Sequence, residues 1–527
     1  MDYKSAAKGA VRFCLLHPLL VLVPLEAFLL FWRIGLLTMW TDELSTLETV
    51  TRPVGEILKA TRADVHPPLY FLLAHAWLRL PLPGGVMDRI RELSCVFTLI
   101  ATFLLDRLWL AKLRPARRAT VLLLWCLSPA VLLYGRMGRS YLMQTALVIV
   151  AVAAAWGALR RPGRLKMTGS AAALLAVLYT HYVPGIALFL AIGIALAIQT
   201  VRSRQARQAG LLLGWFALVL IGYLPWLFQL DKALQGWRAG ANSAGRYSLT
   251  GLFPAEQALK AGYGFVSFSL GETFPFWALA AVPAIAILFV VSFRRLWRAS
   301  RGLTGLLLLA AVIGYAGVAR WVSYPFIPAR LLWLLPFFLL WIALSPGVRP
   351  AARAGLVLFL VAADLASIVS YYQRENFRNR GYAVPLAGIA ATVRAQSDPE
   401  STLLILDTYN TDSKVFLYYL ADERIHSVLV TPETKMEVTA KLQDPRLRRF
   451  WSLRNTHDIS PAGLSRQLED LACGSAPRCR RFYLPYAGWE RAMMRLAGIQ
   501  DPPTHFYLLT ECSLNPGAPQ GLASSSR

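Results

Sequence analysis

Two adjacent carboxylates stand at the start of the first polar interval of this chain. Asp42 and Glu43 lie in the stretch WTDELS, directly after a long apolar run, and the same interval contains Asp64 and His66 in the stretch ADVHPPLY. A carboxylate beside a substrate hydroxyl could act as a general base. The alternative is structural, because Asp and Glu in the first turn of a helix stabilise its N-terminus. With Thr41 as the N-cap, the pair could serve that purpose alone.

Arginine, histidine and tyrosine recur near the corresponding ends of later apolar runs. Arg139 and Tyr141 follow the third run, His181 and Tyr182 lie between the fifth and sixth, and Arg330 lies near the start of the tenth. The guanidinium fork of arginine fits a phosphate, and an arginine inside an apolar segment usually faces a polar cavity or a partner. These residues indicate a polar site on one side of a membrane. The alternatives are that His181 is a structural histidine and that Arg330 links two helices.

Apolar segments long enough to cross a bilayer must position these residues. The chain has 527 residues, of which 56% are hydrophobic, and about 20 helical residues cross a hydrocarbon core about 30 Å thick. The pattern predicts an all-α polytopic membrane domain over residues 1–372, with about eleven transmembrane helices. The expected spans are 14–35, 89–110, 119–135, 140–159, 168–182, 184–200, 209–230, 274–293, 303–321, 327–345 and 353–372.

Basic residues cluster at alternate junctions between these spans. A formal net charge of +25 would suit a nucleic-acid-binding protein, but this placement is the positive-inside pattern of membrane proteins. We therefore expect no nucleic-acid partner, a cytoplasmic N-terminus, and outer loops at 36–88 and 231–272. The short apolar segment 67–80 is expected to form an interfacial or re-entrant helix, because a span there would invert every later charge cluster.

Residues 373–512 are polar and contain short β-like runs. The runs are 402–407, 427–431, 481–486 and 505–512, and helix-like segments lie between them at 412–422 and 461–472. Strand–helix alternation predicts a soluble C-terminal α/β domain with a partly parallel sheet on the outer side. No glycine-rich phosphate loop follows a strand, so we expect no nucleotide cofactor. Residues 513–527 are expected to be disordered.

The cysteines of this C-terminal domain fit an oxidising compartment. Cys473 and Cys479 lie close together in the sequence and are expected to form a disulfide, which leaves Cys512 without a partner. Two free thiols are the alternative.

Six outer-face motifs occur in an order that resembles one superfamily. They are Asp42-Glu43, His66-Pro-Pro-Leu-Tyr70, Arg139-x-Tyr141, Thr180-His-Tyr182, Leu224-Pro-Trp226 and Pro328-x-Arg-Leu-Leu332. This order is similar to the GT-C integral-membrane glycosyltransferases over residues 10–372. It is most similar to the bacterial branch related to protein O-mannosyltransferases, the lipid A aminoarabinose transferase and the rhizobial lipopolysaccharide galacturonosyltransferases.

The resemblance implies an inverting hexosyl- or pentosyltransferase that takes its sugar from a polyprenyl phosphate such as undecaprenyl phosphate. Asp42 would be the catalytic base, and Glu43 would orient it or line the acceptor site. Arginines would neutralise the leaving phosphate, which needs charge compensation more than a proton. The residues expected to bind the donor phosphate or substrate are His66, Arg139, Tyr141, His181, Tyr182 and Arg330.

Two departures from the family pattern concern polar residues. Many relatives carry Gln-Glu-Ala-Arg-Pro-Tyr after the third helix, where this chain has Arg-Met-Gly-Arg-Ser-Tyr at 136–141. Some relatives hold a divalent metal ion with a Glu just before a Lys-Pro-Pro, where this chain has Val65. The nearest carboxylate is Asp64, so a metal site made by Asp64 and His66 is left open.

The implied setting is a bacterial inner membrane, with the active site and the C-terminal domain on the periplasmic side. Expected partners are the lipid-linked donor, the bilayer and an acceptor: lipid A or lipopolysaccharide, another glycan or lipid, or a protein. The protein is expected to be a monomer. The alternatives are a polyprenyl-linked lipid transporter or flippase, and a membrane assembly protein. A transporter would favour internal repeats and polar residues at the bilayer midplane, and an assembly role leaves Asp42-Glu43 without a purpose.

Overall fold

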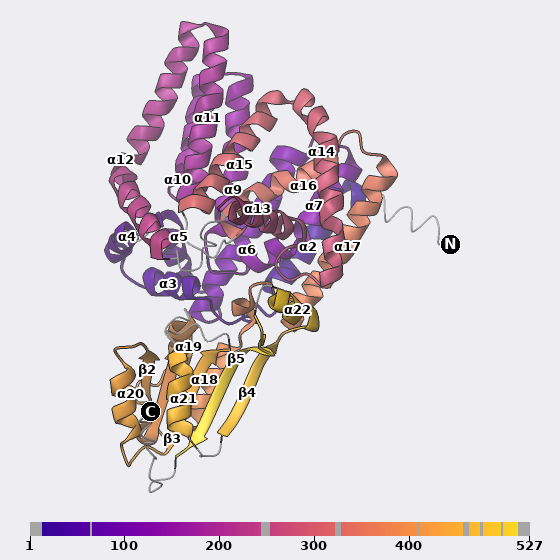
Figure 1. Cartoon of the computed structure of the whole chain (residues 1–527). Helices are drawn as coiled ribbons and strands as arrows, with labels where there is room; N and C mark the ends of the chain where they lie inside the picture. Colours follow the sequence, from indigo (N-terminus) through magenta and orange to yellow (C-terminus); the bar gives the residue numbers. More distant parts are fainter. Residues whose placement is uncertain are drawn as a thin grey trace. The chain divides into compact units, whose positions relative to one another are not determined.

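The fold is taken from a computed structural model of the whole chain (Figure 1). It describes residues 13–63, 66–243, 253–321, 328–407, 412–456, 463–474, 478–496 and 499–514. Asp64 and residues 515–527 of the expected disordered tail therefore lie outside the described residues.

The chain divides into two units, and the division does not follow the sequence order. We call the first the transmembrane unit; it comprises Met1–Ile34 and Ser45–Arg378. The second, the C-terminal unit, comprises Asn379–Arg527 together with Gly35–Leu44. The ten residues that carry Asp42 and Glu43 are therefore part of the C-terminal unit.

Each of the eleven predicted spans coincides with helical structure in the transmembrane unit. Seven of the described helices are long and apolar enough to cross a membrane, or eight if Pro115–Cys126 and Pro129–Gly135, which meet at a bend of 50°, form one span. Pro18–Phe31, Leu69–Leu78 and Pro328–Leu344 are shorter apolar helices. The helices at the predicted spans are α2 (Pro18–Phe31), α6 (Val86–Leu105, continued by the π-helix Asp106–Leu110), α7 (Pro115–Cys126), α8 (Pro129–Gly135), α9 (Tyr141–Arg160), α10 (Arg164–Leu178), α11 (Tyr182–Ser203), α12 (Ala206–Ser243), α14 (Ala281–Ala299, preceded by the 3-10 helix Phe276–Ala280), α15 (Arg301–Trp321), α16 (Leu335–Leu344, preceded by the 3-10 helix η4, Pro328–Leu334) and α17 (Pro350–Gln373).

The polar intervals between these spans are also largely helical. The first contains α3 (Thr41–Val50), α4 (Val54–Ala63) and α5 (Leu69–Leu78), and α5 is the short helix expected at 67–80. The expected outer loop at 231–272 contains the end of α12 and most of α13 (Phe253–Leu270). Hydropathy alone could not show this, because a polar interval says where a span ends and leaves the local backbone conformation open.

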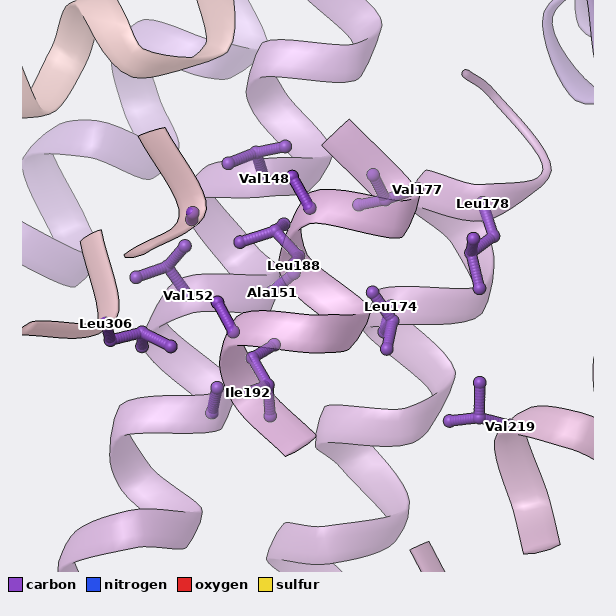
Figure 2. Packing of buried hydrophobic residues seen from close by; sticks show 14 of the residues in the cluster. Val148, Ala151, Val152, Leu174, Val177, Leu178, Leu188, Ile192, Val219 and Leu306 are labelled. Carbon is purple, nitrogen blue, oxygen red and sulfur yellow. The ribbon is translucent and has the colours of Figure 1, made fainter. Parts of the chain in front are cut away.

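Small and branched apolar side chains pack α9, α10 and α11 together. The cluster in Figure 2 joins Val148 and Val152 of α9 to Leu174 of α10 and to Leu188 and Ile192 of α11, and all five are fully buried. Alanines between them let the backbones approach closely, as is usual between membrane helices. This packing fixes the ends of α9, α10 and α11, where the candidate site residues lie.

The C-terminal unit contains a five-stranded mixed sheet in the order β2-β1-β3-β5-β4, in which β1 is parallel to β2 and β3, and β5 is antiparallel to β3 and β4. All six residues of β1 are buried, so both faces of the sheet are covered there. The strands are β1 (Thr402–Asp407), β2 (His426–Val430), β3 (Arg449–Asn455), β4 (Arg478–Pro485) and β5 (His505–Ser513), and the α-helices are α18 (Leu386–Gln396), α19 (Asp412–Leu420), α20 (Lys435–Leu442), α21 (Leu464–Cys473) and α22 (Gly488–Leu496).

The predicted partly parallel sheet is confirmed, and one strand was missed. β3 reads RFWSLRN, and its arginines hide the apolar alternation. In the sheet, Arg454 pairs with the buried Glu469 at 3.1 Å, and Arg449 lies 3.6 Å from Glu511. The charges that obscure the strand are therefore neutralised by neighbours distant in the sequence.

The predicted Cys473–Cys479 disulfide is wrong. Cys473 at the end of α21 is bonded to Cys512 of β5, with 5.6 Å between their Cα atoms, and Cys479 is free and exposed. The register explains this outcome, because Cys479 pairs with Glu511, and neighbouring residues of a strand point to opposite faces. Cys479 therefore faces away from the side on which Cys512 meets α21.

We expect peptide mapping under non-reducing conditions to recover a cross-link between Cys473 and Cys512, with Cys479 labelled by maleimide without reductant. Because this disulfide closes a loop of 39 residues, Cys512→Ala should lower the stability of the C-terminal unit by about 2–4 kcal/mol. Cys479→Ala is the matched control and should change stability little. Recovery of a Cys473–Cys479 peptide would contradict this pairing.

Candidate functional site

Arg139 is the centre of a buried polar cluster in the transmembrane unit. Its side chain is 6% exposed. Nη1 donates a hydrogen bond to Thr46 Oγ1 at 2.9 Å, and Nη2 lies 3.0 Å from His66 Nε2. Arginine has no acceptor, so Nε2 of His66 is the acceptor in this contact. His66 thus orients the guanidinium in this arrangement.

The backbone at Arg139 is fixed by the tight turn between α8 and α9. The Arg139 amide donates to the Met137 carbonyl at 2.7 Å. Ser94 of α6 donates to the Arg139 carbonyl at 3.1 Å, and Tyr70 of α5 lies 3.1 Å from the Ser94 hydroxyl. Three segments distant in the sequence therefore hold this arginine in place.

His181 lies in the connection between α10 and α11 and caps the N-terminus of α11. Its Nδ1 accepts a hydrogen bond from the Val183 amide at 3.2 Å, and its ring centroid is 6.1 Å from that of His66. Burial lowers the pKa of His181 well below its usual value, and the nearby His66, Arg330 and Arg139 lower that pKa further. His181 is therefore neutral. Its lowered pKa indicates that its surroundings are electropositive.

The neutral state of His181 gives a pH prediction. The unfolded chain binds a proton at His181 near pH 6.5, about the ordinary histidine pKa, whereas the folded chain binds it only at lower pH. The stability that His181 contributes is thus complete above about pH 6.5 and is lost as the pH falls below that value. We expect the melting temperature in nanodiscs to fall less between pH 7.5 and 5 for His181→Asn, whose amide oxygen can still cap α11. Equal slopes for the two proteins would contradict this role.

Arg330 is placed by the 3-10 helix η4. It is partly buried, and its carbonyl accepts a hydrogen bond from Trp333 Nε1 at 3.1 Å. Trp333 is fully buried in the helical core. Arg330 also contributes to the lowered pKa of His181. Arg330 therefore lies close enough to His181 to act on its charge. A role of Arg330 in binding phosphate stays a prediction.

The two candidate tyrosines are buried packing residues in this structure. Tyr141 begins α9, and its ring lies 5.6 Å from that of Tyr134 in an edge contact. The Tyr182 hydroxyl accepts a hydrogen bond from Trp226 Nε1 at 2.8 Å. Both are at most 4% exposed. A direct substrate contact from either stays a prediction.

Asp42 and Glu43 occupy the first turn of α3, the local structure that the capping alternative foresaw. Glu43 is 1% exposed, and its carboxylate accepts a hydrogen bond from the Trp40 amide at 3.0 Å. This contact is one half of a capping box, in which the side chain of the third helical residue accepts from the amide that precedes the helix. Asp42 is partly exposed. Glu43 therefore has a structural role at the start of α3.

The C-terminal unit holds the segment that precedes α3. The Met39 amide donates a hydrogen bond to the Tyr419 hydroxyl of α19 at 3.1 Å. The Trp40 ring meets the Tyr382 ring edge-on, with 4.9 Å between centroids. Sequence reasoning missed both tyrosines, because their partners lie more than 300 positions away.

The described residues do not fit the suggested metal site. Among them no three His, Cys, Asp or Glu side chains come together in a way that could hold a metal ion. Asp64 lies outside the described residues. His66 directs Nε2 at the guanidinium of Arg139, and that positive charge disfavours a second cation there. No metal step is therefore included in the proposed mechanism.

A buried carboxyl that the sequence did not single out lies between α13 and α14. Glu272 is 2% exposed and accepts hydrogen bonds from Tyr263 at 2.7 Å and Ser267 at 2.9 Å. Burial raises its pKa. Its carbonyl accepts a bond from the Arg378 amide at 2.8 Å, so Glu272 joins this connection to the residues after α17.

Comparisons with known proteins give structural likenesses only. No family model and no curated protein matches the chain. It is similar to ArnT from Cupriavidus metallidurans bound to undecaprenyl phosphate, with 12% identity and a TM-score of 0.46 over 95% of this chain and 98% of that one. It is also similar to the Archaeoglobus fulgidus oligosaccharyltransferase complex with Zn and sulfate (12%, TM-score 0.41, 74% and 60% covered). A third likeness is to the arabinofuranosyltransferase AftD from Mycobacteria (13%, TM-score 0.39, 94% and 41% covered).

Proposed function

We propose that this protein is an inverting glycosyltransferase that moves a sugar from a polyprenyl phosphate to a hydroxyl of the cell envelope on the periplasmic face. The observation that carries the proposal is the cluster around His181: Arg139 contacts His66, the His66 ring lies beside that of His181, and both Arg139 and Arg330 lower the pKa of His181. Two guanidinium groups at one location suit a phosphate. A phosphate that leaves with the electron pair of its bond needs this positive field.

The helix geometry of α3 supports Asp42 as the base. Asp42 and Thr46 are four residues apart on this helix, so their side chains share one of its faces. Thr46 binds Arg139. A carboxylate one helical turn from an arginine-bound threonine is suitably located to take a proton from an acceptor while a phosphate is bound beside it.

The proposed reaction has one displacement step. The acceptor oxygen attacks the anomeric carbon from the face opposite the phosphate, and Asp42 takes the proton of that oxygen. The bond from the anomeric carbon to the phosphate oxygen breaks, and the polyprenyl phosphate keeps the electron pair. Arg139 and Arg330 neutralise its charge, His66 and Thr46 keep Arg139 oriented, and inversion follows from the opposite-face attack.

The C-terminal unit supports the periplasmic placement. The Cys473–Cys512 disulfide belongs to it, and disulfides persist in oxidising compartments. Basic clusters at alternate junctions favour a cytoplasmic location for the opposite ends of the spans. The acceptor is an envelope lipid, glycan or protein hydroxyl.

A transfer assay tests the proposal. Purified protein in nanodiscs would be incubated with radiolabelled undecaprenyl-phosphate sugars and a membrane extract that contains acceptors. We expect one donor to be consumed, with the label appearing in an acceptor and free undecaprenyl phosphate released. Retention of bound donor without any transfer, together with movement of the lipid between leaflets, would replace this proposal with the transporter.

A further prediction, which depends on the proposed transferase activity, concerns the hydroxyl of Tyr419. Tyr419→Phe removes the hydroxyl that accepts the Met39 amide bond just before α3. Loss of one such bond, worth about 0.5–1.5 kcal/mol, should lower kcat several-fold while donor binding is unchanged, because α3 is less well positioned. Tyr418→Phe is the control, since the neighbouring Tyr418 is 48% exposed. Equal kcat for both variants would show that this bond does not position Asp42.

A further inference from the structure

Helix α22 of the C-terminal unit presents its apolar side chains outwards. Trp489 is 37% exposed, Met493 58% and Leu496 81%, and Ala492 between them is also exposed. These positions follow the spacing i, i+3, i+4, i+7, which puts all four on one face of a helix. In a helix packed on its own domain this face would be turned to the core.

The polar side of α22 makes the contacts to the rest of the C-terminal unit. Glu490 forms an ion pair with Arg380 and accepts a hydrogen bond from the Ala487 amide at 2.8 Å. Arg380 also donates to the Pro485 carbonyl at 3.0 Å and lies over the Tyr486 ring at 4.4 Å. The outward apolar face is therefore a consequence of specific contacts on the opposite side of the helix.

The same contacts join α22 to a residue that follows a candidate membrane span by only a few positions in the chain. Arg380 lies seven residues after Gln373, where α17 ends. A chain of seven residues reaches at most about 25 Å when fully extended. Because α17 is long and apolar enough to cross a bilayer, the arginine that holds α22 cannot be far from a membrane surface.

We propose that α22 is an interfacial helix that inserts its apolar face into the outer leaflet of the membrane. Trp489 would lie at the level of the lipid headgroups, where tryptophan is enriched. Met493 and Leu496 would reach the boundary of the acyl chains, as the apolar face of an interfacial helix does. The exposed Arg495 beside this face complements the phosphate of the lipid headgroups.

A lipid surface fits this face better than a second copy of the chain does. The face is one narrow stripe of a nine-residue helix, which is far smaller than the interface of a stable dimer. It also combines a tryptophan, two flexible apolar side chains and a flanking arginine, the composition of membrane-surface helices. An insertion of this kind would hold the C-terminal unit against the bilayer.

Spin-label accessibility tests the proposal in the full chain. Cys14 and Cys479, the exposed free cysteines, would be changed to Ser, and a nitroxide placed through Met493→Cys. Met436→Cys is the matched control, because Met436 is 81% exposed on α20 of the same unit. In nanodiscs that contain anionic phospholipid, we expect the label at 493 to collide with oxygen several-fold more than with a water-soluble nickel chelate. The label at 436 should show the reverse.

Two outcomes would overturn the proposal. If both labels behave as water-exposed, α22 does not enter the membrane. If the label at 493 is shielded from oxygen and nickel alike, a protein surface covers the face. Dipolar broadening between labels in that case would identify the cover as a second copy of the chain.

Discussion

Asp42→Asn should abolish sugar transfer and leave donor binding intact. The change removes the group that takes the acceptor proton, and general-base catalysis contributes about 10²–10⁴-fold in rate. We therefore expect kcat to fall by about that factor. Asparagine keeps the size and most of the hydrogen-bonding capacity of the side chain, so the fold of α3 should persist. The measurement is transfer of radiolabelled sugar, alongside donor binding by equilibrium dialysis.

Two other acids of α3 serve as controls for Asp42. Glu48→Gln changes an exposed carboxylate of the same helix and should leave kcat unchanged. Glu43→Gln weakens the cap that Glu43 provides to the Trp40 amide, so it should lower thermal stability more than it lowers kcat. If Asp42→Asn transfers sugar at the wild-type rate, the base lies elsewhere and Asp42 only caps α3.

Arg139→Ala should reduce both donor affinity and turnover. The guanidinium is nearly buried and already oriented by Thr46 and His66, so its loss removes a prearranged donor to the leaving phosphate. Removal of one such group typically costs about 10²–10³-fold in kcat. Arg139→Lys should recover part of this loss, because it restores the charge without the planar fork. Kinetics with varied donor concentration separate the effects on KM and kcat.

The controls for Arg139 separate local charge from folding. Arg52→Ala removes an exposed arginine just beyond α3 and should leave the kinetics unchanged. Thr46→Val removes only the hydroxyl that orients Arg139 and should give a smaller loss than Arg139→Ala with an unchanged fold. If Arg139→Ala binds donor normally while its melting temperature falls, Arg139 is an interhelical tie and the phosphate lies elsewhere.

The sequence was informative wherever one local pattern decides a structure. The length of an apolar run predicts a membrane helix, because every backbone polar group in hydrocarbon must be satisfied within its own segment. Helical structure occupies all eleven predicted spans, and seven or eight of the described helices are long and apolar enough to cross a membrane. Alternation likewise predicted β1, β2, β4 and β5, but it failed for β3, whose arginines pair with Glu469 and Glu511 from distant parts of the chain.

The candidate site likewise contains residues that the sequence could predict and residues that it could not. Residue types and their positions at the ends of runs singled out His66, Arg139, His181 and Arg330, which the structure brings together. The residues that orient Arg139 were not predictable. Thr46 and Ser94 carry no distinguishing pattern, and only the packing of α3, α5 and α6 brings them to the arginine.

The sequence by itself determined the membrane helices, the mixed α/β domain and the residues that could do chemistry, because each depends on composition and spacing within about one helix or strand. Only the tertiary structure decided the Cys473–Cys512 pairing, the capping role of Glu43 and the union of Gly35–Leu44 with the C-terminal unit. Except for the Glu43 cap, these features join groups that are distant along the chain. Which distant groups meet depends on the packing of whole elements, and the cap depends on where α3 begins.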